Sequence, residues 1–410
     1  MSEPVVSFCI PTYNRSRYLD SLLTSLQDQL ANFPHAYELV ISDNASPDDT
    51  QDVLARFESS LPIRHFRQDS NIGGAANWHF VVTRARGEFI VSLGDDDALL
   101  GDQTAQAITC LNAMPSVGAA FAPWVLYDLP TDRQLGRFYS HPDDFLVQRG
   151  DHQALLDGVL RHRIWPEIGI VRRKLLHRVM PRVPEHAFYA FVHAGEYLSR
   201  SDVVFLKDPF YVFVVRHFEG DKRAQTGTQE AMKAWDRYRG GLEYLMSRFA
   251  SDLTAQERNA YVTKISTFIG ERMAMAVKLR LQNKADPIDT FYLAARATAL
   301  GAGRKLPEPM QHLRSKAALH FLTHDVELNR DKRQLVCVGS FEDGLRRGLA
   351  RQGAAEVSFH DALPDLQDLH DALVFVRDAK VIDQLDDDPL LATHNVHVVS
   401  EADLMAKFSC

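Results

Sequence analysis

The chain has 410 residues, of which 45% are hydrophobic and 24% are charged, and its formal net charge is −8. This length and hydrophobic content allow two or three cores of ordinary size and exclude a disordered chain. The negative charge argues against broad binding to nucleic acid, because such binding needs a basic surface that releases counterions from phosphate.

The cysteines and the N-terminus indicate a reducing compartment. The four cysteines are scattered, with no spacing typical of a zinc site or a disulfide framework: Cys9, Cys110, Cys337 and Cys410. The opening MSEPVV carries an acidic residue and a proline where a signal peptide would have its basic and apolar regions. No apolar run reaches the roughly 18 residues of a membrane span. We therefore expect a cytoplasmic protein, peripheral to the inner face of the membrane if its acceptor is lipid-linked.

The first part of the chain alternates short apolar runs with amphipathic stretches. This pattern predicts strand and helix units wound into a mostly parallel sheet. The predicted strands are residues 5–10, 38–42, 63–67 and 88–93. Leucines at helical spacing over 19–30 predict a helix capped by Asn14, and further helices are expected over 47–57, 75–84 and 103–114.

Periodicity then divides the rest of the chain. Residues 228–324 show long helical periodicity, and LVCVGS, EVSFHD, ALVFVR and NVHVVS predict four strands after residue 333, with a helix over 341–352. We predict an α/β domain over 1–227, a helical region over 228–330 and a small Rossmann-like α/β domain over 331–410. The last has Gly339 and Gly344 without G-x-G-x-x-G spacing, which favours a structural or protein-contact module.

Polar clusters follow three of the strands, where ligands bind in open α/β sheets: PTYNR, DNASPDD and GDDD. In the last cluster, Asp95, Asp96 and Asp97 stand together directly after a strand. Such carboxylates repel one another unless a cation relieves the repulsion, and oxygen ligands suit Mn²⁺ or Mg²⁺. The alternative is a solvated acidic turn or the start of a helix.

Four motifs resemble, in order, those of the inverting family 2 glycosyltransferases: VSFCIPTYNR, LVISDNASPDDT, NIGGAANW and GDDDALL. The resemblance implies a GT-A fold, a nucleotide-sugar donor and a divalent metal ion. The donor-binding residues that it implies are Pro11, Thr12, Tyr13, Arg15, Asp43, Asn71, Gly73, Asn77, Asp95 and Asp96, and the metal ligands are Asp96, Asp97 and His217.

The resemblance also assigns roles within the donor site. Thr12 and Tyr13 would contact the nucleobase, and Asp43 would read the uracil imide. The family's Asp-x-Asp-Asp element would begin at Gly94, which leaves Asp95 for the ribose and Asp96 or Asp97 for the metal. Each motif has a plainer interpretation: Asp43 would cap a helix and Trp78 would pack in the core.

An inverting transfer needs a base that takes the proton of the acceptor hydroxyl. In the family this base is an acidic residue about a hundred residues beyond the metal motif, where HAGEYL makes Glu196 the candidate. The usual second acidic residue is Tyr197 here, and Glu196 is otherwise an ordinary helix glutamate. The rival acidic residues are Glu185, Asp202 and Asp208. After the predicted strand YVFVV, Arg216 would pair with phosphate and His217 would complete the metal shell.

The sequence thus predicts a metal-dependent inverting glycosyltransferase. Its expected donor is a UDP-sugar, and its expected acceptor is a hydroxyl of a cell-surface glycan or glycoconjugate, free or lipid-linked. Sugar-phosphate nucleotidyl transfer is the first alternative, although PTYNR lacks the glycine-rich basic loop of that class. A catalytically degenerate nucleotide-binding or assembly module is the second. A homo-oligomer formed through the helical or C-terminal region is left open.

Overall fold

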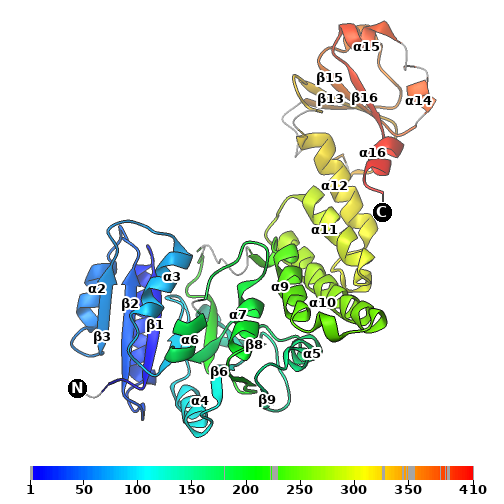
Figure 1. Cartoon of the computed structure of the whole chain (residues 1–410). Helices are drawn as coiled ribbons and strands as arrows, with labels where there is room; N and C mark the ends of the chain where they lie inside the picture. The colour runs from blue at the N-terminus through cyan, green and yellow to red at the C-terminus, as the bar shows by residue number, and fades with distance from the viewer. Residues whose placement is uncertain are drawn as a thin grey trace. The chain divides into compact units, whose positions relative to one another are not determined.

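The computed structural model of the chain describes residues 3–409 except 180, 222, 224–229, 326–327, 344–345, 348, 350–355, 379, 384 and 386–387 (Figure 1). The chain packs into two compact units. Unit 1 comprises residues 1–225 and 234–268, and unit 2 comprises residues 226–233 and 269–410. The predicted division at 227 and 330 stays a prediction.

Unit 1 is built on an eight-stranded sheet of order β3-β2-β1-β4-β10-β6-β11-β9. The strands are β1 (Val6–Thr12), β2 (Tyr37–Asp43), β3 (Ile63–Arg67), β4 (Phe89–Ser92), β6 (Val117–Phe121), β9 (Phe145–Val147), β10 (Gly169–Arg172) and β11 (Asp202–Phe205). The first four strands along the chain pair in parallel, as predicted. β10 is antiparallel to both of its neighbours. The expected α/β fold is confirmed.

The first four helices of unit 1 along the chain lie on the four predicted helical segments. The helices of the unit are α1 (Ser16–Gln29), α2 (Thr50–Phe57), α3 (Gly74–Thr83), α4 (Gly101–Ala113), α5 (His152–His162), α6 (Arg173–Val179), α7 (Tyr189–Leu198) and α9 (Trp235–Ser247). The predicted cap is wrong, because α1 follows Arg15 and Asn14 lies in a left-handed turn with φ 53°. The first N–H of α1, on Ser16, donates instead to Asp48 Oδ2 at 2.8 Å.

A second, four-stranded sheet in unit 1 has the order β5-β12-β7-β8. Its strands are β5 (Ala98–Leu99), β7 (Trp124–Asp128), β8 (Arg133–Arg137) and β12 (Tyr211–Arg216), and β12 is the predicted YVFVV strand. The two residues of β5 directly follow the three aspartates and pair antiparallel with Tyr211 and Val212. This pairing fixes the acidic turn against β12, far away in sequence.

Unit 2 holds α11 (Pro287–Ala299), α12 (Met310–His324) and a sheet of order β14-β13-β15-β16, and α10 (Ala255–Gln282) begins in unit 1 and continues into it. The strands are β13 (Gln334–Val338), β14 (Glu356–His360), β15 (Ala372–Val376) and β16 (His397–Ser400), and the short helices are α14 (Lys380–Asp383), α15 (Pro389–Thr393) and α16 (Glu401–Lys407) (Figure 1). All four strands are parallel, which confirms the predicted α/β module. Gly344 and half of the predicted helix over 341–352 lie outside the described residues. No helix in the described part of the chain is long and apolar enough to cross a membrane.

Candidate functional site

The first and fourth sequence motifs meet at one edge of the main sheet. β1 and β4 are parallel neighbours, so their carboxyl ends lie side by side. Thr12, at the end of β1, donates its hydroxyl to Asp95 Oδ2 at 2.7 Å. The Arg15 guanidinium lies 3.1 Å from Asp95 Oδ1 and 2.8 Å from Asp96 Oδ2. Thr12, Arg15, Asp95 and Asp96, all predicted from the sequence, therefore form one cluster.

The three aspartates have different environments. Asp95 and Asp97 are buried, whereas the Asp96 side chain keeps 17% of its surface exposed. Burial and the Asp96 charge raise the pKa of Asp95 to about 6, against the opposing effect of Arg15. Burial and Asp96 likewise raise the pKa of Asp97 to about 7. Crowding these carboxylates is costly, and their neighbours offset the cost with hydrogen bonds and positive charge.

Asp97 faces the second sheet. Its Oδ2 accepts from the Tyr211 hydroxyl at 2.6 Å, and its Oδ1 accepts from Val214 N at 3.0 Å. The Tyr211 oxygen in turn accepts from Gly94 N at 3.0 Å. Both Asp97 oxygens are thus used inside the protein, and the carboxylate fixes the acidic turn onto β12.

The segment after β12 folds over Asp96. Arg223 Nε lies 2.8 Å from Asp96 Oδ2, and its guanidinium also pairs with Asp221. His217 Nε2 lies 2.8 Å from the main-chain oxygen of Asp96. Asp221 also accepts from Tyr18 at 2.9 Å and from His217 N at 3.0 Å. Asp96 is therefore neutralised by two arginines, and His217 lies directly beside it. Arg216, which the sequence predicted to pair with phosphate, pairs with Asp128 at 2.7 Å.

Carboxylates and a histidine suit the predicted metal ion as ligand types. Where the chain is described, their side chains are not arranged around a common metal position. In the described residues, no three His, Cys, Asp or Glu side chains are grouped as metal ligands. Asp97, predicted as a ligand, is turned toward β12 because Tyr211 and Val214 hold it there. Asp96 is the carboxylate that would hold Mn²⁺ or Mg²⁺. A cation would have to share Asp96 with Arg15 and Arg223 or displace them.

Asp43 lies at the carboxyl end of β2 and is fully buried. Its Oδ1 accepts from Ser46 N at 2.8 Å, and its Oδ2 accepts from Gln51 Nε2 at 2.6 Å. The carboxylate thus shapes the loop between β2 and α2. Tyr13, by contrast, is 43% exposed. A nucleobase bound beside β1 would contact the Tyr13 ring. Asp43 would affect nucleobase binding only through the loop that it holds.

Hydrogen bonds of side-chain amides connect the third motif, NIGGAANW, to the second, LVISDNASPDDT. Asn71 Oδ1 accepts from Asn44 Nδ2 at 2.8 Å and from Gly73 N at 2.9 Å. Gly73 has φ 86°, which only glycine adopts at little cost. Asn77 is 2% exposed and exchanges hydrogen bonds with Ser42 at 2.6 and 2.9 Å. Asn77 therefore holds α3 against β2 from the interior, whereas Asn71 and Gly73 lie on the exposed loop.

The structure does not bring Glu196 to the acidic cluster. Glu196 lies in the last turn of α7, where burial raises its pKa and Arg200 and Arg248 oppose the rise. β11, which follows α7, starts beside Val117, the first residue of β6. The last turn of α7 thus points to the opposite end of the sheet from the cluster. Sequence spacing alone could not reveal the direction of this helix.

The rival acidic residues lie elsewhere. Asp202 starts β11 at that same opposite end and accepts from Arg149 N at 2.8 Å. Asp208 lies 3.9 Å from Arg137, and Glu185 is exposed.

Sequence reasoning missed Tyr211 and Arg223. Tyr211 begins a strand that reads only as apolar, so nothing in the sequence marks its hydroxyl. Arg223 falls in a polar stretch that looks like an ordinary loop. Its one available signal was the acidic residue Asp221 just before it in the sequence, a candidate partner of opposite charge.

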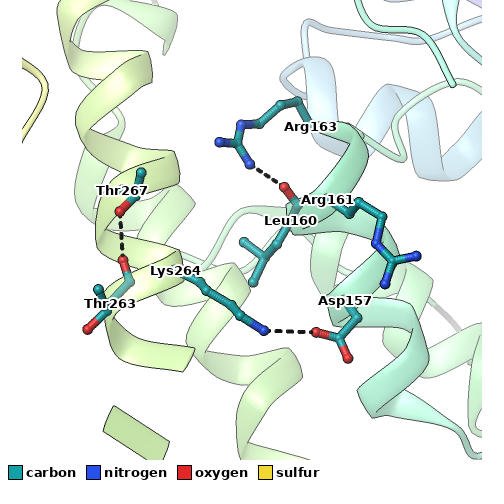
Figure 2. A pocket seen from close by; sticks show the side chains of 7 residues that line it. All are labelled: Asp157, Leu160, Arg161, Arg163, Thr263, Lys264 and Thr267. Carbon is teal, nitrogen blue, oxygen red and sulfur yellow. Dashed lines mark hydrogen bonds and ion pairs between the residues drawn. The ribbon is translucent and has the colours of Figure 1, made fainter. Parts of the chain in front are cut away.

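A separate pocket of about 350 Å³ lies between α5 and α10 and contains none of the predicted site residues. Lys264 Nζ lies 3.5 Å from Asp157 Oδ1. Figure 2 shows this pair, with Arg161 and Arg163 at the end of α5. Basic side chains at the carboxyl end of a helix complement its dipole. The basic side chains beside this pocket are therefore explained by the end of α5.

The part of the chain that carries the cluster is similar to known proteins. Residues 7–177 match the model of glycosyl transferase family 2. Abequosyltransferase RfbV of Salmonella typhimurium is 35% identical over 35% of this chain and 43% of its own length. Validoxylamine A glucosyltransferase of Streptomyces hygroscopicus subsp. limoneus is 32% identical over 28% of this chain and 25% of its own length.

A third relative, the poly(ribitol-phosphate) beta-N-acetylglucosaminyltransferase TarS of Staphylococcus aureus, is 32% identical over 22% of this chain and 16% of its own length. The chain thus spans less than half the length of these relatives. A solved structure of TarS residues 1–349 with UDP-GlcNAc has a TM-score of 0.44 and 18% identity, and covers 73% of this chain and 89% of that one. The similarity to glycosyl transferase family 2 thus covers residues 7–177, the part of the chain that carries the cluster.

Proposed function

We propose that the chain transfers a sugar, with inversion, from a nucleotide-sugar to an acceptor hydroxyl. The observation that carries this proposal is the convergence of Thr12, Arg15, Asp95 and Asp96 at the carboxyl ends of β1 and β4. A nucleoside diphosphate leaving group needs positive charge beside its phosphates and oxygen acceptors beside its ribose. The cluster offers both at the edge where open α/β sheets bind ligands.

The donor would lie across the ends of β1, β2 and β4. Tyr13 and the loop held by Asp43 would face the base, and Asp95 would accept from the ribose. When the donor binds, Arg15 and Arg223 would leave Asp96 and pair with the diphosphate of the donor. A diphosphate carries more negative charge than one carboxylate and so attracts the arginines more strongly. Asn71 and Gly73 would contact the diphosphate-sugar from the exposed loop before α3.

A divalent cation, Mn²⁺ or Mg²⁺, remains part of the proposal. It would neutralise the charge that develops on the departing diphosphate. Asp96 would hold it, with His217 close by. The Asp97 carboxylate would act differently, by keeping the acidic turn in place through Tyr211.

The acceptor is proposed from the named relatives. An abequosyltransferase and a poly(ribitol-phosphate) N-acetylglucosaminyltransferase are both among them. Others include a putative teichuronic acid biosynthesis glycosyltransferase. The acceptor proposed for this chain is accordingly a hydroxyl of a bacterial surface glycan or glycoconjugate, reached from the cytoplasm. UDP is the proposed nucleotide of the donor.

The first test is calorimetric titration of the full chain with UDP, GDP, dTDP and CDP, each with and without Mn²⁺. We expect micromolar binding of one nucleotide, strengthened by the metal. Failure of all four to bind folded protein would contradict the proposed function and favour a degenerate module.

A further inference from the structure

A small pocket is lined by residues of the main-sheet strands β4, β6 and β10 and of the helices α3, α6 and α7. Its volume is about 100 Å³, which is room for roughly three water molecules at ~30 Å³ each. Ser92, the last residue of β4, lines it, and the acidic turn begins two residues further along the chain. The pocket thus adjoins the candidate donor site and admits one edge of a sugar ring.

Glu167 is the acidic residue that lines this pocket. β10 is antiparallel to β4, with Ile170 opposite Val91, so the chain just before β10 lies beside the carboxyl end of β4. Glu167 is part of that chain. Its backbone is fixed, since Glu167 N donates to Trp165 O at 2.9 Å and Ala122 N donates to Ile168 O at 3.1 Å. The fold therefore holds this carboxylate at the same sheet edge as Asp95 and Asp96.

The pocket has an aromatic wall of fixed orientation. Trp78 donates its indole N–H to Ser92 Oγ at 3.0 Å. The His193 ring lies parallel to the Trp78 ring, with 6.2 Å between centroids and 12° between planes. His193 is fixed in turn by Arg182 O, 2.8 Å from its Nε2. Rigid aromatic faces beside a carboxylate suit a sugar, which offers apolar C–H faces and hydroxyl edges.

Tyr189 connects the carboxylate to α7. Its hydroxyl donates to Glu167 Oε1 at 3.1 Å. Tyr189 is the first residue of α7, and Glu196 is seven residues further on, or about 10 Å along the helix axis at ~1.5 Å per residue. The beginning of α7 therefore lies at the pocket, and its end, with Glu196, lies away from it.

We propose that this pocket binds the hydroxyl-bearing edge of the acceptor sugar and that Glu167 is the catalytic base. The inference rests on the proposed glycosyl transfer. The acceptor oxygen forms a bond to the anomeric carbon of the donor, and its proton passes to the Glu167 carboxylate. The bond from the anomeric carbon to the diphosphate breaks, and the nucleoside diphosphate leaves with that electron pair. Tyr189 orients the carboxylate and, through Glu167, acts as a positioning residue.

The test uses the full chain and needs no known acceptor. Slow hydrolysis of a nucleotide-sugar, with water in place of the acceptor, requires the same base. A panel of UDP-, GDP- and dTDP-sugars with Mn²⁺ is incubated with wild type, Glu167→Gln, Glu196→Gln and the matched exposed control Glu58→Gln. Nucleotide release gives the rate, and calorimetry with UDP, GDP and dTDP gives binding. Glutamine keeps an oxygen for the Tyr189 hydroxyl, so folding should be preserved.

We expect Glu167→Gln to lower the hydrolysis rate at least 100-fold, with nucleotide affinity within about twofold of wild type. Tyr189→Phe should lower kcat more than it changes KM and should move the acidic limb of the pH–rate profile, which a purely structural role would not do. Wild-type hydrolysis by Glu167→Gln, or a loss confined to Glu196→Gln, would overturn the base assignment and leave the proposed function standing. No nucleotide binding by wild type would overturn both.

Discussion

The Tyr211 hydroxyl lies 2.6 Å from Asp97 Oδ2, although 114 residues separate the two in sequence. The Tyr211 hydroxyl oxygen also accepts from Gly94 N. Tyr211 therefore holds both ends of the acidic turn, Gly94 and Asp97. The shape of the candidate donor site thus depends on a strand of the second sheet. This contact explains how two buried carboxylates are tolerated beside a third.

Tyr211→Phe should destabilise the protein. It removes one hydroxyl and leaves the buried Asp97 oxygen and Gly94 N without their partner, which should lower the free energy of unfolding by about 1–3 kcal/mol. Urea unfolding followed by circular dichroism measures this. The matched control is Tyr127→Phe, which removes an exposed hydrogen bond to Asp132 and should change stability much less. Equal effects of the two substitutions would contradict the role given to Tyr211.

Asp96→Ala should abolish the part of nucleotide binding that depends on metal. Asp96 is the most exposed carboxylate of the three, and the two others are used inside the protein. Titration of UDP with and without Mn²⁺ should give the same weak affinity for the variant. Asp102→Ala, on the exposed start of α4, is the control and should keep the wild-type metal effect. If Asp96→Ala retained that effect, the metal would be held elsewhere.

Stability should depend on pH through His193. Burial lowers the pKa of His193 below its ordinary value of 6.5, while its bond to Arg182 O opposes the shift. The unfolded chain therefore binds a proton near pH 6.5 that the folded chain takes up only at lower pH. The contribution of neutral His193 is fully present above pH 6.5 and is lost as pH falls below it. The drop in Tm between pH 7.5 and pH 5.5 should be smaller in His193→Gln than in wild type. An equal drop would assign the dependence to other histidines.

The parallel strands and their helices could be predicted because apolar runs and helical spacing are local signals. Motif order also located Thr12, Arg15, Asp95 and Asp96, since all four lie at strand ends that a parallel sheet brings together. Glu196 shows where this reasoning stops. Its motif position was suitable, but which end of α7 faces the site depends on how β11 pairs with β6. Glu167, which we propose as the base, could not be located from the sequence for a similar reason, because the antiparallel pairing of β10 with β4 brings it to the sheet edge.

The two arginines on Asp96 lead to a prediction about the free protein. Arg223 and a metal ion compete for Asp96, because a positive charge already 2.8 Å from its Oδ2 repels a second cation. Arg223→Gln should therefore bind Mn²⁺ more tightly without nucleotide, as measured by electron paramagnetic resonance of free Mn²⁺. It should also be less stable, since the Asp221 side chain is 2% exposed and loses its cation. Arg216→Gln is the control, because Arg216 pairs with Asp128 and should leave Mn²⁺ affinity unchanged. Weaker Mn²⁺ binding by folded Arg223→Gln would show that Arg223 organises the metal site instead of competing with the ion.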